Sequence, residues 1–151
     1  LGRKHSIEET IEAIEKSKQA GFSNFNLDFI FSVPGMNKDL WRKSIYKALE
    51  FNPKHISAYS LIIEPNTPFE TIYRDKSKLP TDDLANEFYQ ELCLILKELG
   101  FIHYEVSNFA QPGFESKHNL NYWLGREYFA FGVSAHRYLN GIRTANSRDL
   151  E

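Results

Sequence analysis

Segments with the apolar spacing of helices alternate with segments typical of strands between residues 6 and 106. The helical segments begin at Ser6, Asn37 and Thr81, where apolar residues start to recur every three or four positions. The strand segments span residues 25–31, 55–63 and 101–106. A helix that connects two strands of one sheet normally makes them parallel through a right-handed crossover. This order therefore predicts an α/β fold with parallel strand pairing.

Local signals mark where the predicted helices begin and end. Ser6 and Glu9 have the spacing of a capping box, and Gly21 suits the left-handed residue that ends a helix. The pair Asn52-Pro53 ends the second helix, because proline disfavours the helical conformation in the residue before it. Asp82-Asp83 opens the third helix, where the helix dipole favours anions.

A β-hairpin is predicted over residues 138–143. Asn140-Gly141 at its centre is the pair typical of a type I′ turn. We therefore expect several βα units of a barrel or open sheet, followed by an antiparallel extension. Residues 64–80, which include three prolines, and residues 111–117 are expected to be the longest loops.

Composition narrows the classes of partner. The net charge of −2 gives no sign of nucleic acid or of an anionic membrane surface. No apolar run reaches the length of a membrane span. With Cys93 as its only cysteine, the sequence cannot form an internal disulfide, which fits the reducing cytoplasm. Cys93 itself is interpreted as a core residue. The only methionine is Met36, so we expect the sequence to be an internal part of a longer protein.

Asp28 is the first candidate site residue. It lies within an apolar strand segment, on the face opposite the phenylalanines, where a carboxylate is costly unless it is hydrogen-bonded or ligand-bound. In barrels, sites form at the carboxyl ends of strands. A ligand contact and a purely structural acceptor are both open interpretations. His55, on the next strand, is interpreted as a core histidine with satisfied hydrogen bonds.

The segment from His118 to Trp123 is the second candidate site. It places an imidazole, two carboxamides, a phenol and an indole side by side. An imidazole can ligate a metal ion or a heme iron, and the two rings can stack on a flat ligand whose polar edge the amides fix. A surface aromatic turn is the alternative interpretation.

His103, Glu105, His118 and His136 offer the ligand types of a two-histidine, one-carboxylate metal site. His103 and Glu105 alternate along a predicted strand and would share a face. A barrel hydrolase that uses His103, Glu105 and His118 is therefore a further hypothesis. Residues 132–136 resemble a nucleophile elbow without its last glycine, which disfavours a serine hydrolase. The sequence has no glycine-rich dinucleotide motif and no P-loop.

Several motifs in a fixed order together resemble the oxygen-independent coproporphyrinogen III oxidase family of radical S-adenosylmethionine (SAM) proteins. The resemblance spans essentially the whole sequence. The matching segments are residues 1–5, 26–35, 55–59, 64–69, 104–110, 118–123 and 132–136.

The resemblance implies a partial (βα)6 barrel that holds a [4Fe-4S] cluster and SAM. Residues 1–110 would be the C-terminal part of this barrel, and residues 111–151 would begin an α+β, heme-binding C-terminal domain. Four residues match SAM-pocket positions: Arg3 and Asp28 through side-chain contacts, Ile62 and His136 as lining residues.

Within the family, the segment from His118 to Trp123 resembles the heme-chaperone branch. The resemblance implies that His118 is the axial ligand of heme and that Asn119, Tyr122 and Trp123 surround it. The implied function is to bind heme and to deliver it to apo-hemoproteins, with peripheral membrane association through such clients. The alternative is oxidative decarboxylation of coproporphyrinogen III to protoporphyrinogen IX. Whether the protein is an enzyme stays open.

One departure from the family concerns the cluster. Its three-cysteine motif does not occur in this sequence, and the glycine-rich SAM segment does not occur either. Cys93 alone cannot hold a four-iron cluster. We therefore expect the cluster ligands outside these 151 residues.

Overall fold

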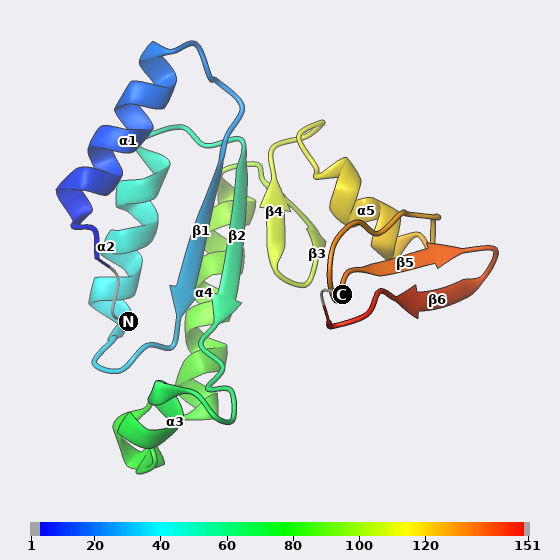
Figure 1. Cartoon of the computed structure of the whole chain (residues 1–151). Coiled ribbons are helices and arrows are strands. Elements are labelled where there is room, and N and C mark those ends of the chain that lie inside the picture. The colour runs from blue at the N-terminus through cyan, green and yellow to red at the C-terminus, as the bar shows by residue number, and fades with distance from the viewer. Residues whose placement is uncertain (1–3, 150–151) are drawn as a thin grey trace. The chain divides into compact units, whose positions relative to one another are not determined.

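The computed structural model describes residues 4–149 of the chain (Figure 1). The chain forms two compact units, one up to Phe114 and one from Glu115 onward. The first unit is a sheet with helices, and the second combines a short helix with a hairpin.

The first unit contains a four-stranded sheet with the strand order β1-β2-β4-β3. β1 (Asn26–Phe31) and β2 (His55–Ser60) pair in parallel, as predicted. β4 (Asn108–Ala110) pairs antiparallel with β2 on one side and with β3 (Ile102–Glu105) on the other.

The expected parallel pairing of the third strand segment with the second is wrong. Because β4 lies between them, β3 runs in the same direction as β2 without pairing with it. The chain reverses through a tight turn at Val106-Ser107 and returns at once as β4. A strand of three residues is too short to show a periodic pattern, so β4 could not be predicted from apolar spacing.

The three predicted helices are confirmed as α1 (Ile7–Gln19), α2 (Lys38–Leu49) and α4 (Asp82–Glu98). Ser6 and Glu9 form the capping box of α1 in both directions. The side chains of Asn37 and Thr81 cap α2 and α4 by accepting from backbone amides in the first turn. No described residue of α1 is buried, although its isoleucines line a cleft against β1 and α2.

Trp41 of α2 is the centre of the core between the sheet and the helices α2 and α4. Its indole contacts Phe29 edge to face at 5.3 Å and lies 5.7 Å from Phe31, measured between ring centroids. The indole Nε1 donates a hydrogen bond of 2.8 Å to the backbone carbonyl of Phe88 on α4. A buried indole needs such a partner, so this bond joins the two helices as well as satisfying the donor. Cys93, half-buried, packs against the same core as expected.

The segment between β2 and α4 is more ordered than the predicted loop. It contains α3 (Pro68–Ile72) and a 3-10 turn, η1 (Lys76–Lys78). Thr67 caps α3, and Pro68 occupies the first helical turn, where its missing N–H costs nothing.

The second unit consists of α5 (Lys117–Trp123) and a hairpin of β5 (His136–Leu139) and β6 (Ile142–Ala145). Leu139 pairs with Ile142, and Asn140 and Gly141 have φ angles of 51° and 77°. These angles confirm the predicted type I′ turn. No described residue of this unit is buried. The segment from His118 to Trp123 is helical and is not a turn.

Candidate functional site

One face of the sheet is polar. Side chains alternate across a strand, so Asn26 and Asp28 of β1 share a face, and their partners His55 and Ser57 on β2 lie on the same face. The opposite face carries the apolar residues that pack against α2 and α4. We call the set Asn26, Asp28, His55 and Ser57 the polar face.

Asn26 connects the other members of the polar face. Its Nδ2 donates to Oδ1 of Asp28 at 2.5 Å and to the Ser57 hydroxyl at 3.0 Å. Its Oδ1 lies 2.7 Å from Nδ1 of His55. One carboxamide therefore fixes three neighbouring side chains on two strands.

His55 is buried and neutral. Burial lowers the pKa of its imidazole below the ordinary value of 6.5. Since Oδ1 of Asn26 can only accept, Nδ1 carries the proton, and Nε2 accepts from the hydroxyl of Tyr104 at 2.7 Å. Both ring nitrogens are thus occupied, which confirms the interpretation of His55 as a satisfied core histidine.

Asp28 is exposed, so the expectation that it is a costly carboxylate within an apolar strand is wrong. Strand alternation places it on the polar face, away from the core. Ile62, just beyond β2, is also exposed, with 73% of its surface accessible. Arg3, the other expected side-chain contact to SAM, lies outside the described residues.

Asn108 of β4 extends the polar face, because it pairs with Ser57. It is buried, and its Nδ2 donates to the carboxylate of Glu105. Its Oδ1 has no hydrogen-bond partner among the described residues. A buried acceptor without a donor is unusual and marks a position where a ligand donor would be favourable.

The four residues of the metal-site hypothesis belong to different units: His103 and Glu105 lie in the first, and His118 and His136 lie in the second. No three His, Cys, Asp or Glu side chains in residues 4–149 lie close enough to hold a metal ion. His103 stacks on Phe109 with the ring centroids 4.3 Å apart, and its Nε2 lies 3.1 Å from the hydroxyl of Tyr89. A β-bulge between His103 and Glu105 also breaks the alternation that would place both on one face.

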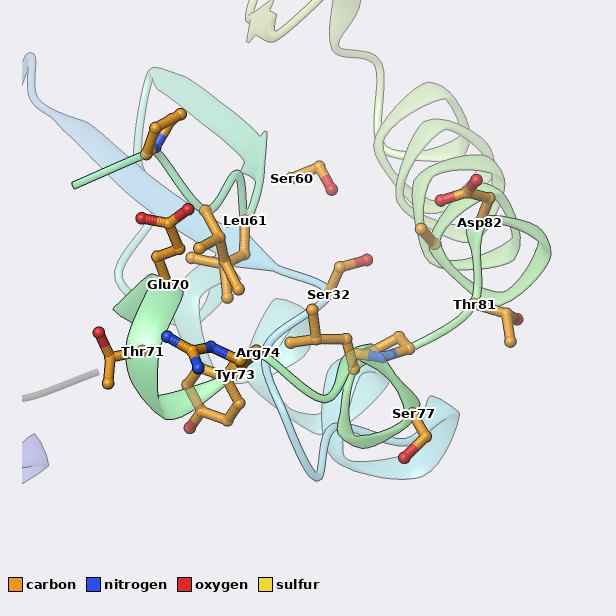
Figure 2. Close-up of a pocket in the computed structure, with 15 residues that line it drawn as sticks. Ser32, Ser60, Leu61, Glu70, Thr71, Tyr73, Arg74, Ser77, Thr81 and Asp82 are labelled. Atoms are coloured by element: carbon orange, nitrogen blue, oxygen red, sulfur yellow. The ribbon is translucent and has the colours of Figure 1, made fainter. Parts of the chain in front are cut away.

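A cavity of about 870 Å³ lies beyond the carboxyl ends of β1 and β2, beside α3 and the start of α4 (Figure 2). Ser32 lines it with a left-handed backbone, φ 59°, and its buried Oγ has no partner among the described residues. Arg74 contributes a guanidinium. Sequence reasoning missed this cavity, because its lining comes from segments far apart in the chain. The only signal available was the rule that ligands bind beyond the carboxyl ends of parallel strands.

In the second unit, α5 presents His118 and Tyr122 on one face, one turn apart. Their rings meet edge to face with centroids 4.9 Å apart. His118 is exposed, and neither of its ring nitrogens has a hydrogen-bond partner within the described structure. Its imidazole is therefore accessible to a ligand.

Asn119 and Trp123 are likewise one turn apart on α5. At about 100° per residue, Trp123 lies about 140° around the helix axis from His118. Trp123 is 61% exposed. The indole therefore lies on the neighbouring face of α5, beside Asn119, and not on the face shared by His118 and Tyr122.

A second cavity, of about 470 Å³, lies within the second unit. His136, expected to line a SAM pocket, lines this cavity together with Tyr122. The structure thus associates His118, Tyr122 and His136 in one unit, and Asp28 and Ile62 in the other. The remaining lining residues are Gly125, Arg126, Tyr128, Tyr138 and Arg143.

Among known proteins, no family model matches the chain. The chain is 40% identical to the heme chaperone HemW of Lactococcus lactis and 39% identical to the heme chaperone HemW of Bacillus subtilis. Each of the two alignments covers 97% of the present chain. The expected resemblance is confirmed. The chain is also 34% identical to a mitochondrial radical S-adenosyl methionine domain-containing protein 1 of Danio rerio. It spans 39% of the two HemW chaperones and 31% of the Danio rerio protein.

The solved structure of coproporphyrinogen III oxidase (HemN) from Escherichia coli, a radical SAM enzyme, has the same fold over 97% of this chain. The TM-score is 0.73, the sequence identity is 19%, and the chain covers 37% of that protein. The predicted fold class, βα units of a radical-SAM barrel with an extension, is thereby confirmed. No helix in residues 4–149 is long and apolar enough to cross a membrane.

Proposed function

We propose that the protein carrying this sequence is a heme chaperone, which binds heme and delivers it to apo-hemoproteins. The observation that carries the proposal is the accessible imidazole of His118, whose ring nitrogens have no partner within residues 4–149. Relatives that are identical to the chain at up to 40% of aligned positions are named heme chaperones, which supports the proposal.

Heme is the cargo in this proposal, and His118 is its axial ligand. A neutral imidazole ligates heme iron through one nitrogen. Tyr122, in edge contact with His118, supplies apolar ring surface beside the ligand. Asn119 and Trp123, on the neighbouring face of α5, are assigned to the porphyrin's surroundings and not to the iron.

We further propose that the polar face contributes to a SAM site, with Asp28 as a side-chain contact and Ile62 as a lining residue. His136 is assigned to SAM by sequence alone. Two observations fit a polar ligand here: the carboxylate of Asp28 is exposed, and Oδ1 of Asn108 is buried without a donor in the described residues. Arg3 belongs to the same assignment by sequence. The carboxylate would accept hydrogen bonds from the amine or hydroxyls of SAM.

A [4Fe-4S] cluster does not fit the residues of this sequence. Such a cluster takes thiolates from several cysteines, and this sequence has one. Burial raises the pKa of the Cys93 thiol, which disfavours the thiolate that iron requires. Cluster ligands are proposed only for a longer protein that contains this sequence.

Hemin titration tests the proposal. Hemin is added to the wild-type chain, to His118→Ala and to His5→Ala, and the Soret band is followed. His5 is an exposed histidine of the first unit and serves as the matched control. We expect binding to be lost in His118→Ala and kept in His5→Ala. Equal affinity and identical spectra for all three proteins would remove His118 from the site.

A second experiment separates chaperone from oxidase. The longer protein, with cluster, SAM and reductant, is incubated with an apo-hemoprotein after heme loading, and separately with coproporphyrinogen III. We expect heme transfer and no release of carbon dioxide, because a shared fold does not carry the chemistry of its relatives. SAM-dependent formation of protoporphyrinogen would contradict the chaperone assignment. The proposal also places the protein in the cytoplasm and takes apo-hemoproteins as the class of its clients.

A further inference from the structure

We propose that Arg126 and Arg143 bind the two propionate carboxylates of heme in the cavity of the second unit. This inference rests on the proposed heme binding at His118. It adds a carboxylate site that decides which tetrapyrroles the protein accepts: those with free carboxylates on one edge.

The cavity combines flat apolar surface with positive charge. Its aromatic lining consists of Tyr122, Tyr128 and Tyr138, and its two cations are Arg126 and Arg143. A volume of about 470 Å³ is in the range of small-molecule sites. Tyrosine rings suit the porphyrin plane, while guanidinium groups suit carboxylates, which they hold through two parallel hydrogen bonds.

A continuous series of ring contacts joins His118 to this cavity. Tyr122, which touches His118, lies 4.4 Å from Tyr128 between ring centroids, and Tyr128 lies 6.3 Å from Tyr138. Backbone hydrogen bonds in both directions tie Tyr128 to Tyr138. Arg143 is the direct cross-strand partner of Tyr138. The proposed iron ligand and the arginines are therefore ends of one surface within one unit.

Neither arginine is neutralised by a carboxylate in the described structure. Arg126 makes a hydrogen bond of 3.4 Å to Oδ1 of Asn121, a neutral group. Glu127, its neighbour in sequence, instead accepts from the backbone N–H of Asn140 at 2.5 Å. For Arg143, no acidic side chain of residues 4–149 lies within ion-pair distance. The other side chains that line the cavity, His136 and three tyrosines, include no carboxylate.

Arg137 provides a matched control on the same hairpin. It is exposed like the other two, but it does not line the cavity and its Nε donates to the hydroxyl of Thr144 at 2.8 Å. Substitution of Arg137 removes the same charge from the same unit without touching the proposed site.

The test compares hemin with hemin dimethyl ester, in which both propionates are blocked. Four proteins are titrated: wild type, Arg126→Gln/Arg143→Gln, Arg137→Gln and His118→Ala. We expect the wild type and Arg137→Gln to bind hemin at least about tenfold more tightly than the ester, since one charge-assisted hydrogen bond corresponds to that factor. In the double variant this preference should vanish, while the Soret position of bound heme stays that of the wild type.

The outcomes separate this inference from the proposed function. Binding that depends on His118 but does not distinguish hemin from its ester in the wild type would overturn the carboxylate site alone. A loss of preference in Arg137→Gln equal to that in the double variant would also overturn it, because a general charge effect would suffice. Failure of the wild type to bind hemin would overturn both. The comparison of hemin with its dimethyl ester needs only the wild-type protein. It therefore still tests the carboxylate site if the double variant does not fold.

Discussion

Nδ1 of His55 lies 2.7 Å from Oδ1 of Asn26, so the parallel strands β2 and β1 are joined by side chains as well as by backbone. On the other side of the ring, Tyr104 of β3 occupies Nε2. This imidazole therefore spans the sheet from β1 to β3, two strands that are not neighbours. The proposed SAM contact Asp28 is hydrogen-bonded to the same Asn26.

Stability is expected to fall in acid because of His55. Its pKa is lowered in the folded chain by burial, so the unfolded chain takes up a proton first as the pH falls through about 6.5. The loss continues until the folded imidazole also becomes protonated at lower pH. Urea unfolding at pH 8, 7, 6 and 5 should show a steeper decline for wild type than for His55→Gln. Parallel declines would show that another group is responsible.

Asn26→Ala should destabilise the first unit by about 1–3 kcal/mol, because it leaves the buried Nδ1–H of His55 without an acceptor. Asn24→Ala is the control, since Asn24 is exposed and outside the polar face. A surface change of that kind normally stays within about 0.5 kcal/mol. Urea midpoints of the two variants measure the difference, and equal midpoints would mean that the side-chain network contributes nothing to stability.

Asp28→Asn, made in a longer protein that binds SAM, is expected to weaken SAM binding while leaving the cluster absorbance intact. The reason is the loss of a charged acceptor on the polar face, while the amide keeps the shape of the side chain. Asp39→Asn, an exposed carboxylate of α2, is the matched control. Calorimetry measures both affinities, and an unchanged affinity in Asp28→Asn would return Asp28 to a structural role beside Asn26.

Trp123→Ala should weaken heme binding less than His118→Ala does, by on the order of 1–3 kcal/mol if only ring packing is lost. The helix geometry gives the reason, since Trp123 lies on the neighbouring face of α5 and Tyr122 on the face of His118. The Soret titration that tests His118 measures this effect too. A Trp123→Ala variant as impaired as His118→Ala would show that the indole is as important as the iron ligand.

Much of the fold could be predicted because its signals are local. The caps Ser6, Asn37 and Thr81 and the turn Asn140-Gly141 each act through residues within a few positions in the chain. The insertion of β4 could not be predicted, because the partner of a strand is decided by distant residues and not by its own periodicity.

The candidate sites show the same division. The segment from His118 to Trp123 is contiguous, so its chemistry was visible in the sequence, whereas its helical conformation was not. Asp28 was identified, but its exposure depends on which face of the sheet the helices cover. The roles of Asn26 and Asn108, and the cavity at Ser32, depend on contacts between strands and loops far apart in the chain.

The type I′ turn has an effect well beyond the two residues that form it. It sets the alignment in which Arg143 faces Tyr138 across the hairpin. Because side chains on a strand alternate, a slip of one residue in the pairing of β5 with β6 would carry Arg143 to the reverse side of the ribbon. Such a slip would keep every charged residue in the sequence and still remove one charge from the cavity. The two-residue length of this turn thus determines which face of the hairpin carries the Arg143 cation. Natural selection for carboxylate binding would therefore also act on the length of the turn.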